Sequence, residues 1–272
     1  MMKTTIMDVM GGTVAEFGSN LALKTKRGGR WESMTWREYY HQVKTTARAF
    51  MALGLEPGKA VNILGNNCPQ WFISDLAAIF AGAIPGGIYA TSSPEQCQYI
   101  AAHSEANIVV VENADQLAKF KAVWSQLPEL KAVVMMNGAD DDERVYAWED
   151  LAPMAGDIPE TELDARMEAQ DPDDCCTLIY TSGTTGNPKG VMITHDNATW
   201  TARQAVSSTG ARPKDELISY LPLSHIAEQV VSLFVPLTVG CTTWFAERLD
   251  QLGDNLREVR PTMFVGVPRV WE

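Results

Sequence analysis

A loop rich in hydroxyls and glycines lies between two apolar runs in the second half of the chain. The runs cover residues 177–180 and 191–194, and the loop carries four Ser and Thr hydroxyls, three glycines and Lys189. Glycines let a backbone approach a ligand closely, and successive free N–H groups in such a loop form a nest for anions. Hydroxyls add hydrogen-bond donors, and a lysine adds a compact positive charge suited to phosphate. The sequence therefore predicts a strand, a tight phosphate-binding loop and a second strand.

The spacing within this loop separates it from a Walker P-loop. A Walker loop needs G-x-x-x-x-G-K-[ST] at the start of a helix. Here Gly183 and Gly186 are three residues apart, Gly190 follows Lys189, and a strand is predicted to come next. The alternative is an ordinary polar surface turn, which the same residue types also favour. Because a plain turn does not need four hydroxyls and a lysine between buried strands, we favour a phosphate loop of another class.

Apolar strand patterns alternate with helical patterns along most of the chain. Strands are predicted at residues 61–64, 87–90, 108–111, 132–135, 217–220, 242–245 and 262–265. Helices are predicted at residues 35–54, 70–80, 93 onward, 114–124, 196–207, 224–234 and 250–259. Thr35 with Glu38 forms a capping box, and Ser93 followed by Pro94 is a helix start. This alternation predicts an α/β fold of stacked, mostly parallel βαβ sheets covered on both faces.

The net charge of −12 comes from one segment. Residues 140–174 hold fourteen Asp and Glu against Arg144 and Arg166, whereas the rest of the chain is balanced. A charge run of this kind is usually a solvated connection. We therefore predict a first βαβ half at residues 1–139, an acidic connection at 140–174 and a phosphate-loop half at 175–272. No basic patch is evident, which argues against nucleic acid as a partner.

Cysteine usage and hydropathy bear on the cellular setting. The five cysteines have irregular spacing without a metal-ligand pattern, so we predict no metal site and a reducing, cytoplasmic compartment. The N-terminus lacks the apolar stretch of a signal peptide. The most apolar window, residues 71–90, contains Asp75, Pro85 and three glycines, which favours a core helix and a strand over a membrane span. Peripheral attachment to an intracellular membrane stays open at this point.

Four stretches of the chain resemble a known enzyme family. Residues 181–190 resemble the signature loop of the AMP-forming, acyl-adenylate-forming enzymes, which include acyl-CoA synthetases, peptide-synthetase adenylation domains and luciferases. Residues 219–229 and 265–272 resemble the second and third core motifs of the long-chain fatty acyl-CoA synthetases. Residues 86–97 resemble the bubblegum-type branch of that group. The resemblance covers nearly the whole chain, from about Trp31 onward.

The resemblance implies a long-chain fatty acid–CoA ligase that uses ATP, Mg²⁺ and coenzyme A. A fatty carboxylate would attack the α-phosphorus of ATP, and the acyl-adenylate would then react with the thiol of coenzyme A. His225 and Lys189 are the predicted catalytic residues; His225 would donate a hydrogen bond to charge that builds up during attack. The predicted nucleotide-binding residues are Thr181, Ser182, Gly183, Thr184, Thr185, Gly186 and Lys189.

Two histidines have a structural alternative. An ordinary helix cap or packing residue is the alternative for His225, and its place in the second core motif favours the functional interpretation. His195 precedes Asp196 directly after a predicted strand, and we interpret it as a helix-start residue.

The match to the family is incomplete. The family's Tyr-Gly-x-Thr-Glu motif for adenine and magnesium is not found in the chain. A ribose-binding aspartate, a hinge and a small C-terminal domain with a lysine are implied to follow it, and the chain stops at Glu272. We therefore expect a partial N-terminal domain, incomplete at its C-terminus, with little or no ligase activity alone. The alternatives are a fatty acyl-AMP ligase, a peptide-synthetase adenylation domain, or a non-catalytic nucleotide-binding module.

Overall fold

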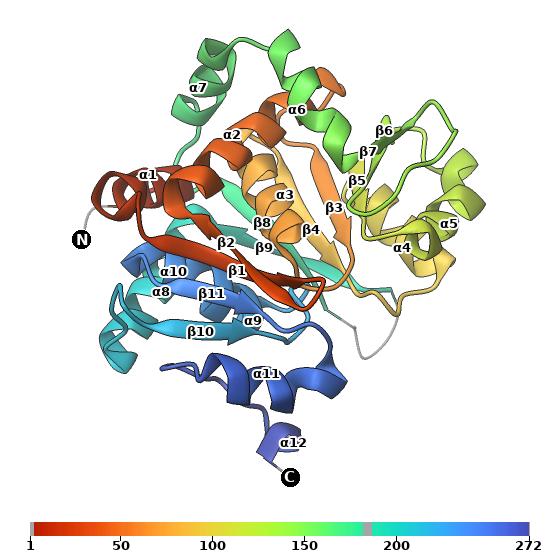
Figure 1. The fold of residues 1–272 in the computed structure, drawn as a ribbon. Helices are drawn as coiled ribbons and strands as arrows, with labels where there is room; N and C mark the ends of the chain where they lie inside the picture. The colour runs from red at the N-terminus through yellow and green to blue at the C-terminus, as the bar shows by residue number, and fades with distance from the viewer. Residues whose placement is uncertain (1–2, 182–186, 272) are drawn as a thin grey trace.

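Two stacked sheets with helices between and around them form the protein (Figure 1). The computed structural model describes residues 3–181 and 187–271. The strands are β1 (Leu21–Arg27), β2 (Arg30–Thr35), β3 (Ala60–Leu64), β4 (Ile84–Ile88), β5 (Ala106–Val111), β6 (Ala132–Met135), β7 (Val145–Ala147), β8 (Cys175–Thr181), β9 (Lys189–Thr194), β10 (Glu216–Ser219) and β11 (Thr242–Phe245). The α-helices are α1 (Ile6–Phe17), α2 (Trp36–Ala52), α3 (Pro69–Phe80), α4 (Pro94–His103), α5 (Ala114–Val123), α6 (Leu151–Met154), α7 (Glu160–Glu168), α8 (His195–Thr209), α9 (Ile226–Glu228), α10 (Val235–Val239), α11 (Leu252–Val259) and α12 (Pro268–Trp271).

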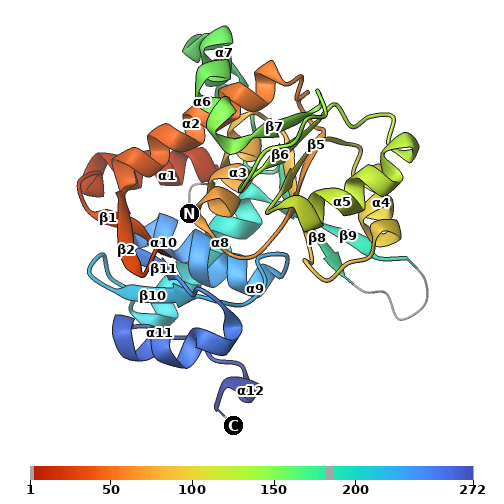
Figure 2. The ribbon, with the colours of Figure 1, turned by 45° about the vertical axis from the view of Figure 1, so that its right-hand side comes forward.

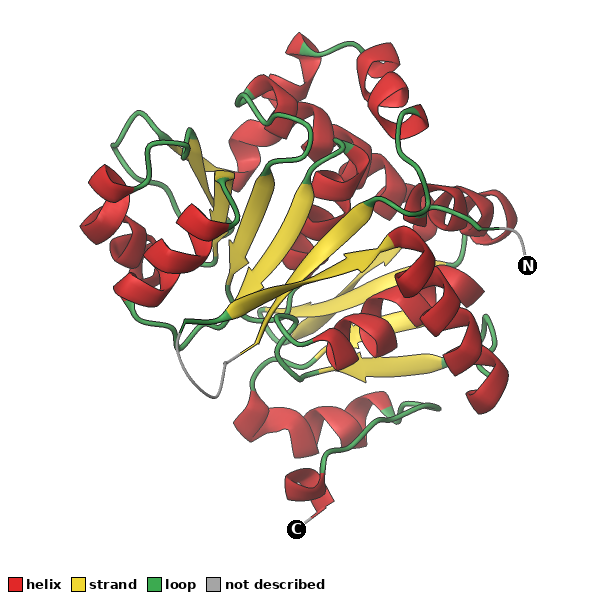
Figure 3. Cartoon of the chain, turned by 180° about the vertical axis from the view of Figure 1, so that it is seen from behind, coloured by secondary structure: helices red, strands yellow, loops and turns green. Residues whose placement is uncertain are grey.

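The strand order confirms the predicted α/β fold. Within the described residues, one sheet has the order β7-β6-β5-β3-β4-β8-β9 and the other has the order β10-β11-β1-β2. Neighbouring strands are parallel except in the pairs β8–β9 and β1–β2, which are antiparallel. Figure 3 shows both sheets from behind, with helices on their outer faces. Each sheet takes strands from both sides of residues 140–174.

Helix α3 lies between the two sheets and is buried along its whole length. Its Phe72 ring meets Phe245 of β11 edge-on, with ring centroids 4.8 Å apart. On its other side it shares a core with Val61 and Ile63 of β3. The apolar window at residues 71–90 therefore forms a core helix and a strand, as predicted. None of the helices in the described ranges combines the length and apolar composition needed to cross a membrane.

The other face of the larger sheet has its own core, covered by α4 and α5 (Figure 2). Val109 and Val111 of β5 point into this second core, whereas Ile108 and Val110 point toward α3. Side chains alternate between the faces of a strand, so a central strand that is buried on both faces is a continuous apolar run. This is the physical basis on which β3 and β6 were predicted within one residue of their observed bounds, and β5 within two.

Two predicted strands need correction. β4 begins at Ile84, earlier than the predicted 87–90, because pairing with β3 overrides the weak strand propensity of Pro85, Gly86 and Gly87. Residues 262–265 do not form a strand; they make a single bridge, from Met263 to Leu217 of β10. The ladder stops there because the Thr262 and Met263 N–H groups both donate to the Glu216 carbonyl (2.9 and 3.2 Å).

The predicted helix at 224–234 is also different in detail. It starts at Ile226 with α9, continues as a π-helical segment over Gln229–Phe234 and ends as α10. Pro236 has no N–H to donate to the carbonyl four residues earlier. That carbonyl, of Ser232, accepts from the Thr243 hydroxyl of β11 at 3.0 Å instead. π-Helical segments occur frequently at functional sites, and this one begins at the end of the second core motif.

The acidic residues 140–174 form more structure than a solvated connection. They contain β7, which pairs with β6 at the edge of the larger sheet, and helices α6 and α7. Leu151 and Leu163 of these helices are buried in the hydrophobic core that also contains the side chains of α3. The charges remain largely on the outer side: Glu160 and Asp164 of α7 pair there with basic residues of α2. Apolar residues spaced between the charges thus dock this segment onto α2.

Helix α3 carries a buried carboxyl group that its surroundings do not stabilise. The Asp75 side chain is 1% exposed, and neither carboxyl oxygen has a hydrogen-bond partner among the described residues. The buried Tyr39 hydroxyl of α2 also lacks a partner in that part of the chain. Burial raises the pKa of Asp75 to about 8, because the charged form is poorly solvated there. Asp75 is therefore predominantly neutral in the folded protein at pH 7.

This burial predicts that stability falls as the pH rises. Between the ordinary pKa of an Asp near 4 and the folded value near 8, the folded state holds a proton that the unfolded state has lost. The free energy of unfolding should decrease across that window by up to about 1.4 kcal/mol per pH unit. Asp75→Asn should flatten the profile measured by urea denaturation from pH 5 to 8. The exposed Glu168→Gln on α7 is the control; parallel profiles for Asp75→Asn and the wild type would contradict the prediction.

Candidate active site

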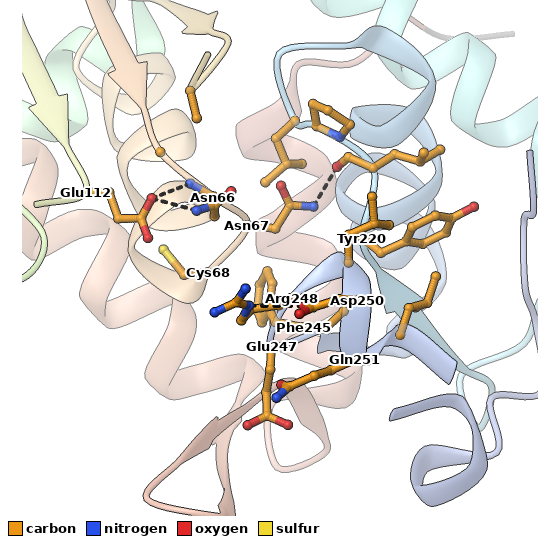
Figure 4. A pocket seen from close by; sticks show the side chains of 18 of the residues that line it. Asn66, Asn67, Cys68, Glu112, Tyr220, Phe245, Glu247, Arg248, Asp250 and Gln251 are labelled. Atoms are coloured by element: carbon orange, nitrogen blue, oxygen red, sulfur yellow. Dashed lines mark hydrogen bonds and ion pairs between the residues drawn. The ribbon is translucent and has the colours of Figure 1, made fainter. Parts of the chain in front are cut away.

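A cleft of about 1610 Å³ lies where strands of both sheets end (Figure 4). Its walls come from the loops after β3, β4, β5 and β6 on one side and after β10 and β11 on the other. Parallel strands bring their carboxyl ends to the same edge, and ligands of open α/β folds bind at such edges. Residues from those loops line the cleft: Asn66, Asn67, Cys68, Tyr89, Thr91, Glu112, Asn137, Tyr220, Leu223, Ser224, Arg248 and Asp250.

The predicted phosphate loop arises from the same edge of the larger sheet. β8 runs parallel to β4, and β9 returns antiparallel to β8, which confirms the predicted strand–loop–strand arrangement. Thr181 is the last residue of β8 and Lys189 is the first residue of β9. They lie opposite each other, and both are exposed. The predicted loop residues Ser182, Gly183, Thr184, Thr185 and Gly186 lie outside the described residues.

Two of the sequence motifs touch at the cleft. A Cβ added to Gly87 of β4 would lie 2.7 Å from Cα of Ser224, closer than real Cβ contacts. Glycine at this position is therefore needed for the turn before α9 to pack against β4. The buried Ser224 hydroxyl lines the cleft and has no partner among the described residues.

His225 follows Ser224 and is exposed at the start of α9. Its Nδ1 accepts a hydrogen bond from the Ala227 N–H at 3.1 Å, so the imidazole caps the helix. The structure thus places His225 beside the cleft in the cap role that was the alternative. A cap through Nδ1 leaves Nε2 available, and a catalytic role for His225 stays a prediction.

His195 has a purely structural environment. It is buried at the first position of α8, as the interpretation of a helix-start residue predicts. Its Nδ1 accepts from the Ile6 N–H at 3.2 Å, so the proton lies on Nε2, which donates to Gln170 Oε1 at 3.1 Å. Burial lowers the pKa of His195 to about 4, which keeps the ring neutral.

A buried hydrogen-bond network behind the cleft was not predicted from the sequence. Glu228 is 3% exposed, and its Oε1 accepts from the Ser219 and Ser232 hydroxyls, both at 2.7 Å, and from the Tyr220 N–H at 3.2 Å. Asn67 Nδ2 donates to the Leu221 carbonyl at 2.7 Å and to the Ser219 hydroxyl at 2.8 Å. In the sequence these residues are single polar positions within loop, strand and helix patterns, and such positions do not show which residues will be hydrogen-bonded to one another.

Tyr220 joins the second and third motifs. Its hydroxyl donates to the Val265 carbonyl at 2.9 Å and accepts from the Val267 N–H at 3.3 Å. Its ring stacks on Phe264, with centroids 5.5 Å apart. Burial raises the pKa of Tyr220, so the hydroxyl keeps its proton and can donate. Three of the four stretches that suggested a family from the sequence, residues 86–97, 219–229 and 265–272, therefore meet at one edge of the fold.

The described residues offer no evident metal site. They hold no group of three or more His, Cys, Asp or Glu side chains arranged to bind an ion.

The comparisons with known proteins agree with this geometry. Residues 13–272 match the family model described as AMP-binding enzyme. A cleft at the strand ends, a glycine-rich hairpin beside it and a match over nearly the whole chain point to the same conclusion. The chain belongs to the AMP-binding enzyme family.

Curated relatives confirm the resemblance to bubblegum-type long-chain acyl-CoA synthetases. The chain is 46% identical over 277 residues to long-chain-fatty-acid–CoA ligase ACSBG2 of Xenopus laevis, covering 98% of this chain and 38% of that protein. It is 45% identical over 266 residues to long-chain-fatty-acid–CoA ligase ACSBG1 of Homo sapiens, covering 94% of this chain and 37% of that protein. The chain thus spans little more than a third of the length of these relatives.

Solved structures share the fold. An anthranilate CoA ligase, AuaEII, in complex with anthranoyl-AMP matches with a TM-score of 0.83 at 23% identity, covering 97% of this chain and 50% of that one. A long-chain-fatty-acid-CoA ligase, FadD1, from Archaeoglobus fulgidus matches with a TM-score of 0.80 at 23% identity, covering 96% of this chain and 51% of that one.

The contact between Gly87 and Ser224 gives a prediction about the cleft wall. Gly87→Ala should destabilise the protein by about 1–3 kcal/mol, because the added methyl group forces the Ser224 backbone away from β4. Urea denaturation measures the loss. Gly156→Ala is the matched control, since no atom lies within 4 Å of its added Cβ. Equal stability of the two variants would show that the turn at Ser224 is not fixed by this contact.

Proposed function

We propose that the protein is a long-chain fatty acid–CoA ligase that forms AMP. One oxygen of the fatty carboxylate attacks the α-phosphorus of ATP, and the bond to pyrophosphate breaks. The sulfur of coenzyme A then attacks the acyl carbonyl carbon of the acyl-adenylate, and AMP leaves. The observation that supports the proposal is that β4 and β8 are parallel neighbours. Gly87, which packs against the turn at Ser224, and the pair Thr181 and Lys189 therefore belong to strands that end at the same edge of the larger sheet. The names of the relatives support the fatty acid as substrate.

The first half of this reaction needs positioning and charge neutralisation more than covalent help. Hydroxyl and backbone donors of the loop would hold the β- and γ-phosphates, and Lys189 would add positive charge or order the loop. Binding residues are proposed at Thr181, Ser182, Gly183, Thr184, Thr185 and Gly186. ATP would bring Mg²⁺ bound to its phosphates, and peripheral attachment to a membrane would bring the enzyme to its apolar substrate; both are part of this proposal.

ATP–pyrophosphate exchange tests the adenylation step. We expect the protein expressed through to its natural stop codon to exchange labelled pyrophosphate into ATP when a long-chain fatty acid is present. Lys189→Ala combined with Thr184→Ala should lower the rate at least about 100-fold, because donors aimed at transferring phosphates each contribute that order. Lys214→Ala, an exposed lysine away from the cleft, is the control.

The pattern of products separates the alternatives. Thioester formation with coenzyme A distinguishes a ligase from a fatty acyl-AMP ligase, which stops at the adenylate. Exchange with amino acids alone would indicate a peptide-synthetase adenylation domain. A folded protein that binds ATP but exchanges pyrophosphate with none of a range of carboxylates is a nucleotide-binding module, and the ligase proposal would be wrong.

A pair of substitutions separates the two roles of His225. Asparagine is also a good helix cap but is shorter and cannot present Nε2. If the imidazole donates to charge that develops during attack, His225→Asn and His225→Ala should both lower the exchange rate by about 10- to 100-fold. His41→Ala, an exposed histidine on α2, should leave it unchanged. Wild-type exchange in His225→Asn would mean that the residue acts only as the cap.

A further inference from the structure

A polar connection through the Asn67 side chain joins the two walls of the cleft. Asn67 belongs to the loop between β3 and α3, on the side of the larger sheet. Ser219 and Tyr220 belong to the end of β10, on the side of the smaller sheet. The Asn67 amide joins the two sides of the cleft through its hydrogen bonds to the Ser219 hydroxyl and the Leu221 carbonyl. Figure 4 shows the Asn67 side chain between the two walls.

Glu228 fixes the acceptor end of this connection. The hydroxyl of Ser219 donates to Glu228 Oε1 at 2.7 Å, so its lone pairs are directed toward the Asn67 amide. Asn67 Nδ2 also lies 3.5 Å from the same carboxylate oxygen. The hydroxyl of Ser232, in the π-helical segment, donates to Oε1 from the other side at 2.7 Å. One oxygen therefore organises a strand end, a helix and a loop.

The burial of Glu228 restricts the movement of the groups that donate to it. A buried carboxylate costs several kcal/mol unless donors surround it, so the donors cannot move away without a large penalty. Burial raises the pKa of Glu228, and the hydrogen bonds from Ser232, Ser219 and the backbone oppose that shift. Asn67 itself is only half-buried and lines the cleft, so it transmits this rigidity to the surface that faces a ligand.

From these contacts we propose that Asn67 and Glu228 are positioning residues of the ligase reaction. They set the separation of the cleft walls and the place of the turn from Tyr220 to His225, without touching the reacting atoms. The proposal rests on the proposed function. Misplacement of a reacting group by about 1 Å lowers rates by about 100-fold, so loss of this connection should lower kcat for adenylation.

The test compares the half-buried Asn67 with a buried asparagine at the opposite end of the strands. Asn67→Ala removes the connection at the cleft. The nearly isosteric Asn67→Asp keeps the shape but replaces the donor with a carboxylate oxygen beside the Leu221 carbonyl and Glu228 Oε1. Asn107→Ala is the matched control: this buried side chain accepts from the Glu56 N–H and donates to the Glu129 carbonyl, far from the cleft in the strand direction. Each variant is made in the protein expressed to its natural stop codon, and exchange kinetics are measured beside thermal unfolding.

Both Asn67 variants should lower kcat by about 10- to 100-fold while KM for ATP changes by less than about twofold. Among the described residues, Asn67 and Glu228 make no hydrogen bond to β8 or β9, the strands that flank the predicted phosphate loop. Asn107→Ala should lower the melting temperature at least as much and keep its kcat. Glu228→Ala should lower kcat as the Asn67 variants do. Glu228→Gln should restore most of it, because an amide oxygen can accept the hydrogen bonds that Oε1 receives from Ser219, Ser232 and the Tyr220 N–H.

Two results would overturn the proposal on its own. One is a kcat of Asn67→Ala no lower than that of Asn107→Ala, and the other is a loss in Glu228→Gln as large as in Asn67→Ala. In both cases the wild type still exchanges pyrophosphate, so the proposed function stands. An inactive wild-type protein with bound ATP would overturn the proposed function, and the positioning role would fall with it.

Discussion

Helix α3 is buried along its whole length between two sheets, and its packing sets how those sheets face each other. Phe72 contacts β11 of the smaller sheet, while neighbouring side chains share a core with β3 of the larger one. A helix buried on all sides must be apolar all round, which the sequence of α3 nearly is. Because α3 starts directly after β3, its position also decides where the loop at residues 65–68 enters the cleft.

The cleft follows from this geometry rather than from any single motif. Strands of both sheets end at the same side of α3, so six loops meet there. The loops of the two sheets can approach each other closely only where a side chain is absent or is hydrogen-bonded across the gap. Gly87 leaves room for the turn at Ser224, and Asn67 donates to the Leu221 carbonyl on the opposite wall. The smaller sheet ends at β10, where Met263 makes one bridge beyond it. The Tyr220 hydroxyl holds the segment after Met263 in place through the Val265 carbonyl and the Val267 N–H.

The sequence predicted those parts of the fold in which one face or both faces of an element are apolar. β5 and β6 were found because a strand buried on both sides must be a continuous apolar run. The predicted start of β4 was three residues late, because Pro85, Gly86 and Gly87 have a low strand propensity. Helix α7 was not predicted, because Leu163 is its one buried residue and most of its other residues are charged or polar. The phosphate hairpin was predicted because glycine and hydroxyl spacing is a local property. The bond between Asn67 and β10 joins residues more than 150 positions apart, and no local pattern encodes it.

The two buried carboxyl groups show why such residues cannot be interpreted from burial alone. Asp75 and Glu228 are almost equally inaccessible, at 1% and 3% exposure. Asp75 has no donor among the described residues, so its burial favours the neutral acid and costs stability as the pH rises. Glu228 has three close donors on one oxygen, so its burial stiffens the elements that supply them. The first lies in the core between the sheets, and the second lies behind the cleft wall, bonded to Ser219 and Tyr220. A reaction that depends on positioning needs a fixed geometry at the cleft, and of these two carboxyl groups Glu228 is the one bonded to elements that form the cleft wall.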